Sequence, residues 1–176
     1  MKYIPVIIVS ILVLVACSNG TEKKSASDEE YENNLPAGLK LLGDSIVLPS
    51  FQITIELTPK AERKLSNDNE TIIVRAYLSG EPKDKVTSPL IDEMGLINLG
   101  ESEVELKKQG TAKFENINVS REAFDLLKKK DFQILINVFS GRKSSDLNLL
   151  DCEILEESVT EVRAKKHTLK GKLIGE

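Results

Sequence analysis

Residues 51–57, FQITIEL, alternate strictly between apolar and polar side chains. This two-residue period is typical of a β-strand that has one face in a core and the other in water. Residues 71–78, TIIVRAYL, are rich in β-branched and aromatic side chains and predict a second strand. Residues 132–139, FQILINVF, are apolar on both faces, so we expect a central strand that is covered on both sides.

Other parts of the chain predict further short strands and two brief helical segments. The remaining strands are expected at residues 96–99, 102–107, 113–119, 152–155 and 169–174. The strands at 102–107 and 113–119 are expected to pair as a hairpin. Thr58 and Pro59 are typical of a helix start, for one or two turns that end near Leu65, and Ser120 is expected to cap the one short helix proper, which carries Phe124 on its apolar face.

This pattern of about seven strands with few helices excludes alternating βαβ units and favours an all-β domain. We predict a two-sheet antiparallel β-sandwich with one short helix, of the immunoglobulin-like or transthyretin-like kind. The chain has no tryptophan and two cysteines, so the tryptophan and disulfide that mark true immunoglobulin domains are absent. The prediction therefore concerns architecture alone.

The N-terminus begins with Lys2 and continues as an apolar run from Ile4 to Val15. A positive charge followed by a short apolar core is typical of a secretory signal peptide. The alternative is a transmembrane helix, but crossing a bilayer takes about 20 apolar residues and this run is shorter. We therefore expect the protein to be exported.

The end of the apolar run, Leu14-Val15-Ala16-Cys17, resembles the lipobox of bacterial lipoproteins. The resemblance implies that fatty acyl chains such as palmitate are attached to Cys17 and that a peptidase cleaves before it. Two or three chains anchor a protein stably, because each buried methylene contributes about 0.8 kcal/mol and one chain binds only marginally. The alternative is an ordinary secretory signal with an incidental cysteine. Ser18, in place of an aspartate, implies the outer membrane if the cell has one.

These features divide the chain into three parts. Residues 1–16 are the expected signal peptide, residues 17–35 the lipidated cysteine with a flexible polar tether, and residues 36–176 a single β-sandwich domain. The tether is expected because a polar segment buries too little apolar surface to offset the entropy of ordering it. Its acidic run at residues 28–32 is expected to be repelled by anionic lipid, and an alternative interpretation is an export signal for the cell surface.

Charge and cysteine content exclude several classes of protein. Cleavage before Cys17 removes Lys2 and leaves 23 Lys and Arg against 28 Asp and Glu, an acidic balance that argues against a nucleic-acid partner. If Cys17 is lipidated, Cys152 has no partner and the domain contains no disulfide. We expect Cys152 to be a buried small apolar residue, with a reactive thiol as the alternative.

Catalytic and metal-binding patterns are missing from the sequence. His167, the one histidine, lies in a polar stretch and is expected to be solvated. Transition metals need several His or Cys ligands, and no nucleotide-binding motif occurs. Calcium needs only oxygen ligands, which Asp146, Asn148 and Asp151 offer, but these residues lack the glycine and carboxylate density of an EF-hand. We therefore predict no enzyme, no cofactor and no metal site.

Two loops remain as candidate binding elements. Arg142, Lys143, Ser144 and Ser145 follow the expected central strand and offer hydroxyls and two cations for an anion, the alternative being a solvated turn. Residues 80–95 include Leu90, Ile91 and Met94, which either form a contact surface or pack on the core. We predict a non-catalytic binding or assembly module of the cell envelope, anchored by lipid, with an envelope protein as partner. The alternative is an envelope carrier of a small ligand or of calcium.

Overall fold

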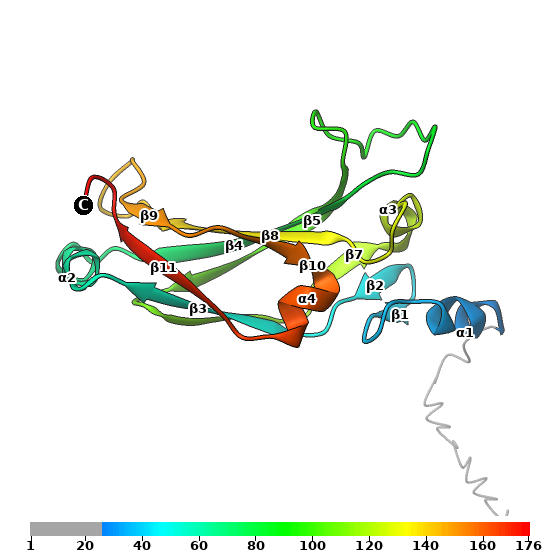
Figure 1. Cartoon of the computed structure of the whole chain (residues 1–176), viewed down its shortest axis with the longest axis horizontal. Helices are drawn as coiled ribbons and strands as arrows, with labels where there is room; N and C mark the ends of the chain where they lie inside the picture. The colour runs from blue at the N-terminus through cyan, green and yellow to red at the C-terminus, as the bar shows by residue number, and fades with distance from the viewer. Residues whose placement is uncertain (1–25) are drawn as a thin grey trace, which may run out of the picture.

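The computed structural model describes residues 26–176, so the predicted signal peptide and Cys17 lie outside the described residues (Figure 1). The helices are α1 (Ala26–Asn33), α2 (Pro59–Asn67), α3 (Arg121–Asp125) and α4 (Val159–Ala164). The strands are β1 (Lys40–Leu42), β2 (Ser45–Val47), β3 (Phe51–Leu57), β4 (Ile72–Gly80), β5 (Ile97–Leu106), β6 (Gly110–Phe114), β7 (Asn118–Ser120), β8 (Gln133–Ser140), β9 (Leu150–Cys152), β10 (Leu155–Ser158) and β11 (His167–Leu173).

The strands form three sheets. The β4 sheet has the order β10-β8-β4-β5, the β3 sheet has the order β6-β3-β11-β9, and a small sheet has the order β1-β2-β7. Figure 1 shows the β4 and β3 sheets as two layers, with the small sheet at one end. The prediction of a β-rich domain is confirmed. The prediction of antiparallel pairing alone is wrong, because β11 runs parallel to β3, with His167 aligned to Ile53.

The parallel pair follows from the route of the chain. After β10, at the edge of the β4 sheet, the chain turns through α4 and enters the β3 sheet as β11, beside β3. A crossover of this kind, rather than a tight turn, is what parallel neighbours need. Ser158 begins α4 by accepting a hydrogen bond from the N–H of Glu161, at 3.3 Å, and Val159 and Val162 are buried. This six-residue helix lies between the strands predicted at residues 152–155 and 169–174, where the sequence predicts no helix.

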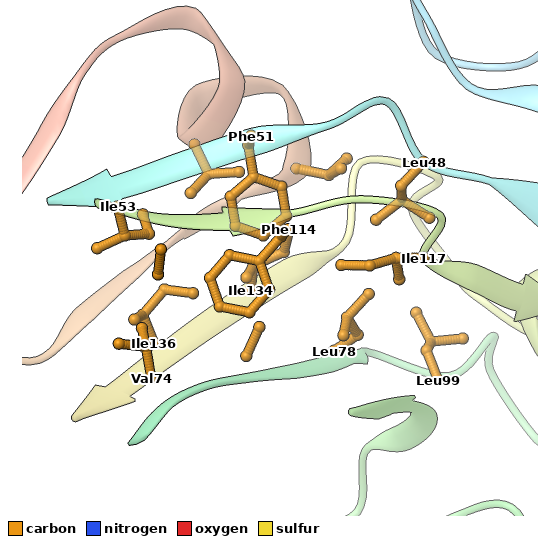
Figure 2. Close-up of a cluster of buried hydrophobic side chains, with 14 of the residues drawn as sticks. Leu48, Phe51, Ile53, Val74, Leu78, Leu99, Phe114, Ile117, Ile134 and Ile136 are labelled. Carbon is orange, nitrogen blue, oxygen red and sulfur yellow. The ribbon is translucent and has the colours of Figure 1, made fainter. Parts of the chain in front are cut away.

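The core lies between the two large sheets, where their inward side chains form one cluster (Figure 2). Phe51 of β3 and Phe114 of β6 stack with ring centres 4.8 Å apart. Val74 of β4 and Ile136 of β8 face them from the β4 sheet and are fully buried. Burying such side chains is the main favourable contribution to folding, so the apolar half of each alternating strand holds the layers together.

The capping signals in the sequence are confirmed. The Thr58 hydroxyl accepts a hydrogen bond from the Ala61 N–H, at 3.2 Å, and α2 then buries Leu65. Ser120 caps α3, which buries Phe124. The prediction of one short helix is wrong, since α1 and α4 were missed. Each is shorter than nine residues and lies in a polar segment, where the apolar period of a helix is hard to detect.

Strand β5 replaces two predicted strands and does not form the predicted hairpin. Gly100, with φ of 113°, lies at the bulge where the β4–β5 register shifts, so Leu99 and Val104 both point inward although they are five positions apart. The hairpin prediction is wrong because residues 107–109 carry the chain between layers: β5 pairs with β4 and β6 pairs with β3.

Helix α1 lies within the segment expected to be a flexible tether. The Tyr31 hydroxyl donates to the Asp125 carboxylate at 2.6 Å, and the Arg121 guanidinium lies 4.0 Å from the centre of the Tyr31 ring. Arg121 also donates to Asp28 at 3.1 Å. These contacts hold α1 against α3. Among residues 26–176, none of the helices has the length and apolar content needed to cross a membrane.

Candidate functional site

The outward-facing sides of the two large sheets differ in chemistry. The outward side chains of the β3 sheet are polar: Gln52, Thr54, Glu56, Thr111, Lys113, Thr168, Lys170 and Lys172. This is the pattern expected of a sheet face in water. The outward side of the β4 sheet, hereafter the β4 outer face, instead carries half-buried apolar and aromatic side chains.

The pairing register defines the β4 outer face as three rows that run across β8, β4 and β5. The rows are Phe139, Ile73 and Glu105; Asn137, Arg75 and Glu103; and Leu135, Tyr77 and Glu101. Its four apolar or aromatic members, Ile73, Tyr77, Leu135 and Phe139, do not belong to the core cluster or to the side chains packed against it. They are therefore half-buried outside the core.

Arg75 lies at the centre of this face and is held by its neighbours. Its guanidinium carbon is 5.7 Å from the centre of the Tyr77 ring and 5.2 Å from that of Phe139. Its Nε donates to the Glu103 carboxylate at 2.5 Å, and its Nη1 donates to the Tyr77 hydroxyl at 3.0 Å. The hydrogen bonds with Tyr77 and Glu103 raise the pKa of Arg75 above its ordinary value. The face thus has a fixed, permanently charged centre.

Two hollows flank Tyr77 on this face. One, of about 490 Å³, is lined by Arg75, Phe139 and Arg142, and the other, of about 470 Å³, by Met94 and Leu135. Both loops that the sequence singled out therefore border the same face, at opposite ends of the sheet. Figure 1 shows the loop between β4 and β5, in green, projecting beyond the sheets.

The loop after β8 does bind an anion, but the anion belongs to the chain itself. The Glu70 carboxylate accepts hydrogen bonds from the N–H of Lys143, at 3.0 and 3.1 Å, and from the N–H and hydroxyl of Ser144, at 2.8 and 2.7 Å. The N–H of Thr71 adds another at 2.9 Å. The Glu70 side chain is buried, so these donors satisfy a charge that would otherwise be costly.

The electrostatics of Glu70 follow from this arrangement. Burial raises the pKa of the carboxyl, but the hydrogen bonds, above all those from Ser144, outweigh it and lower the pKa to about 2. The predicted binding loop thus serves mainly as a structural clamp. Ser145 is also used locally, accepting from the Leu147 N–H at 3.1 Å. Arg142, with φ of 56°, lines the first hollow of the β4 outer face, and the Lys143 side chain reaches the same face at Glu105, 2.5 Å away.

The loop between β4 and β5, residues 81–96, fits both interpretations given for its apolar residues, packing on the core and forming a contact surface. Leu90 and Ile91 pack against the core cluster, whereas Met94 is 83% exposed. The Asp92 carboxylate accepts from the N–H groups of Met94 and Leu96, each at 2.9 Å, and so fixes the turn that presents Met94. The loop is therefore anchored at its base and apolar at its exposed end.

Of the three residues considered for calcium, Asn148 and Asp151 are engaged elsewhere, and the Asp151 carboxylate lies 3.6 Å from the Lys172 ammonium. The Asn148 side-chain oxygen accepts from the N–H groups of Ser140, at 2.9 Å, and Leu150, at 3.1 Å. The Asp92 carboxylate is used as described above. Across the part of the chain that the structure describes, no three His, Cys, Asp or Glu side chains gather as a metal site would require.

His167 is buried rather than solvated, and Cys152 is half-buried rather than fully buried. The prediction of a solvated His167 is wrong: it is 8% exposed because it lies on the inward side of β11, and its Nε2 is 3.6 Å from a Glu157 carboxylate oxygen. Cys152 is half-buried and packs against the core. Burial first, then Asp151 and Glu153, raise the pKa of its thiol to about 11, which disfavours the reactive thiolate.

Comparison of the chain with known protein families, curated proteins and solved structures finds no match. The role of the β4 outer face is therefore inferred from its own side chains. Sequence reasoning nominated the flanking loops but missed Arg75, Tyr77 and Phe139. The two-sided apolar pattern of residues 132–139 is a signal for Phe139, although it predicts a strand covered on both sides.

Proposed function

We propose that this chain is a lipid-anchored lipoprotein of the cell envelope and that its domain is a non-catalytic binding module. The β4 outer face is the proposed contact surface. One observation carries the proposal: Leu135 and Phe139 lie half-buried on the outer side of β8, where they belong neither to the core cluster nor to the side chains packed against it. Apolar side chains that gather outside the core often mark a surface that binds a partner.

The composition of the face supports a protein as the partner. Tyrosine and arginine are the residues most often responsible for binding energy in protein interfaces, and Tyr77 and Arg75 lie at the centre of this face. Charged side chains such as Glu101 and Glu103 surround them, as in interfaces that have an apolar centre and a polar rim. Because Arg75 is already fixed by Tyr77 and Glu103, little side-chain entropy is lost on binding.

An envelope carrier of a small ligand or of calcium is the weaker proposal. The hollows on either side of Tyr77 are open to solvent rather than enclosed. Ligand sites usually enclose most of the ligand surface. The oxygen atoms of Asp92 and Asn148 already accept backbone hydrogen bonds.

The finer classification of the fold belongs to the same proposal. We propose that the β4 and β3 sheets form a β-sandwich of the immunoglobulin-like or transthyretin-like kind. The shared core between the two layers supports it. The parallel β3–β11 pair and the third sheet are departures from the standard arrangement.

The lipid anchor is tested by metabolic labelling with radioactive palmitate. We expect label on the wild-type protein and none on the Cys17→Ala variant, which should also leave the membrane fraction. The lipobox-like run at Leu14–Cys17 motivates this test. Label that persists on the Cys17→Ala variant would contradict anchoring at this residue.

The contact surface is tested by thiol labelling of a matched pair of variants, Gln133→Cys and Gln52→Cys. Both glutamines are exposed strand residues, Gln133 on the β4 sheet beside the second hollow and Gln52 on the outer side of the β3 sheet. The raised pKa of Cys152, about 11, keeps the background reaction slow.

We expect Gln133→Cys to react more slowly in native envelopes than in the purified lipoprotein, because a partner covers it. Gln52→Cys should react equally fast in both preparations. Equal rates for Gln133→Cys in the two preparations would contradict a binding role for this face.

A further inference from the structure

We infer that the partner of the β4 outer face is a protein that presents lysine and arginine side chains around an apolar centre. This inference rests on the proposed function and adds the chemistry of the partner. Three features of the face support it: its charge balance, the position of its charges at the two edges of the sheet, and the way its own cations are engaged.

The charge balance is acidic. Charged side chains lie on the face and around the second hollow, which Met94 and Leu135 line. They are the carboxylates Asp92, Glu101, Glu103, Glu105 and Glu156 and the cations Arg75, Arg142 and Lys143. The Glu101 side chain is 58% exposed and that of Glu103 is 42% exposed, so a partner has access to both.

Two of the three cations already have carboxylate partners on the face. Arg75 pairs with Glu103, and Lys143 pairs with Glu105 at 2.5 Å. Glu101 is 4.0 Å from Arg75, at the limit of an ion pair. Glu156 has no ion pair with any of the described residues. Glu101 and Glu156 are thus the carboxylates best placed to meet cations from outside.

These two carboxylates lie at opposite edges of the sheet. Glu101 is on β5 and Glu156 is on β10, the two edge strands in the order β10-β8-β4-β5. Between them lie the apolar side chains of β8 and β4, including Leu135 and Tyr77. A complementary surface therefore has an apolar centre with cations on both flanks.

The same charges disfavour two other occupants of this face, a second copy of the chain and an anionic lipid surface. A second copy of this chain would bring its own glutamates against Glu101 and Glu103, and like charges brought together in an interface repel each other. An anionic lipid surface would be repelled in the same way. Exposed glutamates along an edge strand such as β5 also discourage pairing between copies.

The test uses the full-length lipoprotein in living cells, with a photo-crosslinking amino acid at position 94 and, as a control, at position 52. Met94 is the exposed residue of the second hollow, and Gln52 is on the opposite side of the molecule's two layers. The crosslinked peptide of the partner is identified by mass spectrometry. The yield is then compared with that of Glu101→Lys/Glu156→Lys, and of the matched variant Glu56→Lys/Glu115→Lys, which makes the same change in charge at exposed residues outside this face.

We expect position 94 to crosslink to one protein through a segment rich in lysine or arginine, and position 52 not to do so. The Glu101→Lys/Glu156→Lys variant should lower the yield about tenfold, because it places cations against cations, while the matched variant should leave it unchanged.

A partner segment without basic residues, or an unchanged yield in the Glu101→Lys/Glu156→Lys variant, would overturn the inference and leave the proposed binding role intact. A crosslink to a second copy of the chain would also overturn it. No crosslink from position 94 would contradict the proposed function itself.

Discussion

The outer sides of the β3 and β4 sheets are built on the same core but have different surfaces. On the β3 sheet the Thr54 and Thr111 hydroxyls lie 3.2 Å apart in a polar surface that suits water. On the β4 sheet the corresponding positions include Ile73, Leu135 and Phe139. Since both sheets fill the core with their inner sides, the apolar outer side chains of the β4 sheet are not needed to close it. This difference is the basis of our proposal that the β4 outer face binds a partner.

The largest effect is expected from two neighbouring residues of β8 that point to opposite sides. Ile136→Ala should lower the free energy of unfolding by about 2–5 kcal/mol, because this fully buried side chain leaves a cavity in the core. Leu135→Ala, on the outer side, should cost about 1 kcal/mol or less. Urea unfolding of the purified protein measures both. Equal losses would show that the outer side is packed as tightly as the core, which would contradict the difference between the two sides of β8.

The next effect concerns the clamp between Glu70 and the loop after β8. Glu70→Gln should cost about 3 kcal/mol at neutral pH, the free energy that corresponds to lowering the pKa of this carboxyl from its ordinary value to about 2. The folded-state pKa is the lower one, so this stabilisation is complete above about pH 4.5 and is lost as the pH falls through about 2.

Unfolding free energies measured between neutral pH and pH 2 test the clamp. The wild type should lose this contribution on acidification, and Glu70→Gln should lack that part of the pH dependence. Parallel pH curves for the two proteins would mean that Glu70 is not held as an anion. In that case the loop after β8 would be free to bind an anion from outside the chain. Both candidate loops would then be available for binding.

A smaller effect is expected from cations on the two outer sides. Arg75→Ala should cost about 1 kcal/mol, because Arg75 lies against two aromatic rings and donates to Glu103. Lys172→Ala should cost less than about 0.5 kcal/mol, because its pairing with Asp151 at 3.6 Å is exposed on the β3 sheet. Thermal unfolding of both variants measures the difference. A cost for Lys172→Ala that equals that for Arg75→Ala would remove the distinction between the two sides.

Local sequence signals predicted local structure. They did not predict the contacts between segments that are distant in the sequence. The alternation of residues 51–57 and the caps at Thr58 and Ser120 depend on neighbouring residues, and each was found where expected. The partners of Glu70 lie more than 70 residues away, in a loop whose hydroxyls and cations suggested an external anion. Nothing in the polar segment around Glu70 marks it as that anion.

The candidate site was predictable only in part, for a related reason. The apolar pattern of residues 132–139 correctly predicted a central strand, β8. A two-sided apolar pattern does not reveal whether the chain itself covers both sides. Here only one side of β8 belongs to the core, and Leu135 and Phe139, on the other side, are half-buried outside it. The pattern that predicts burial on both sides therefore also fits the contact surface that we propose.

The most direct test of this account is carbodiimide footprinting of carboxylates on the unmodified protein, in native envelopes and after purification. We expect Glu101 and Glu103, on the β4 outer face, to be modified less in envelopes than in the purified protein. Glu56, exposed on the β3 sheet, should be modified equally in both. Equal modification of Glu101 and Glu103 in the two preparations would contradict the claim that a partner covers this face.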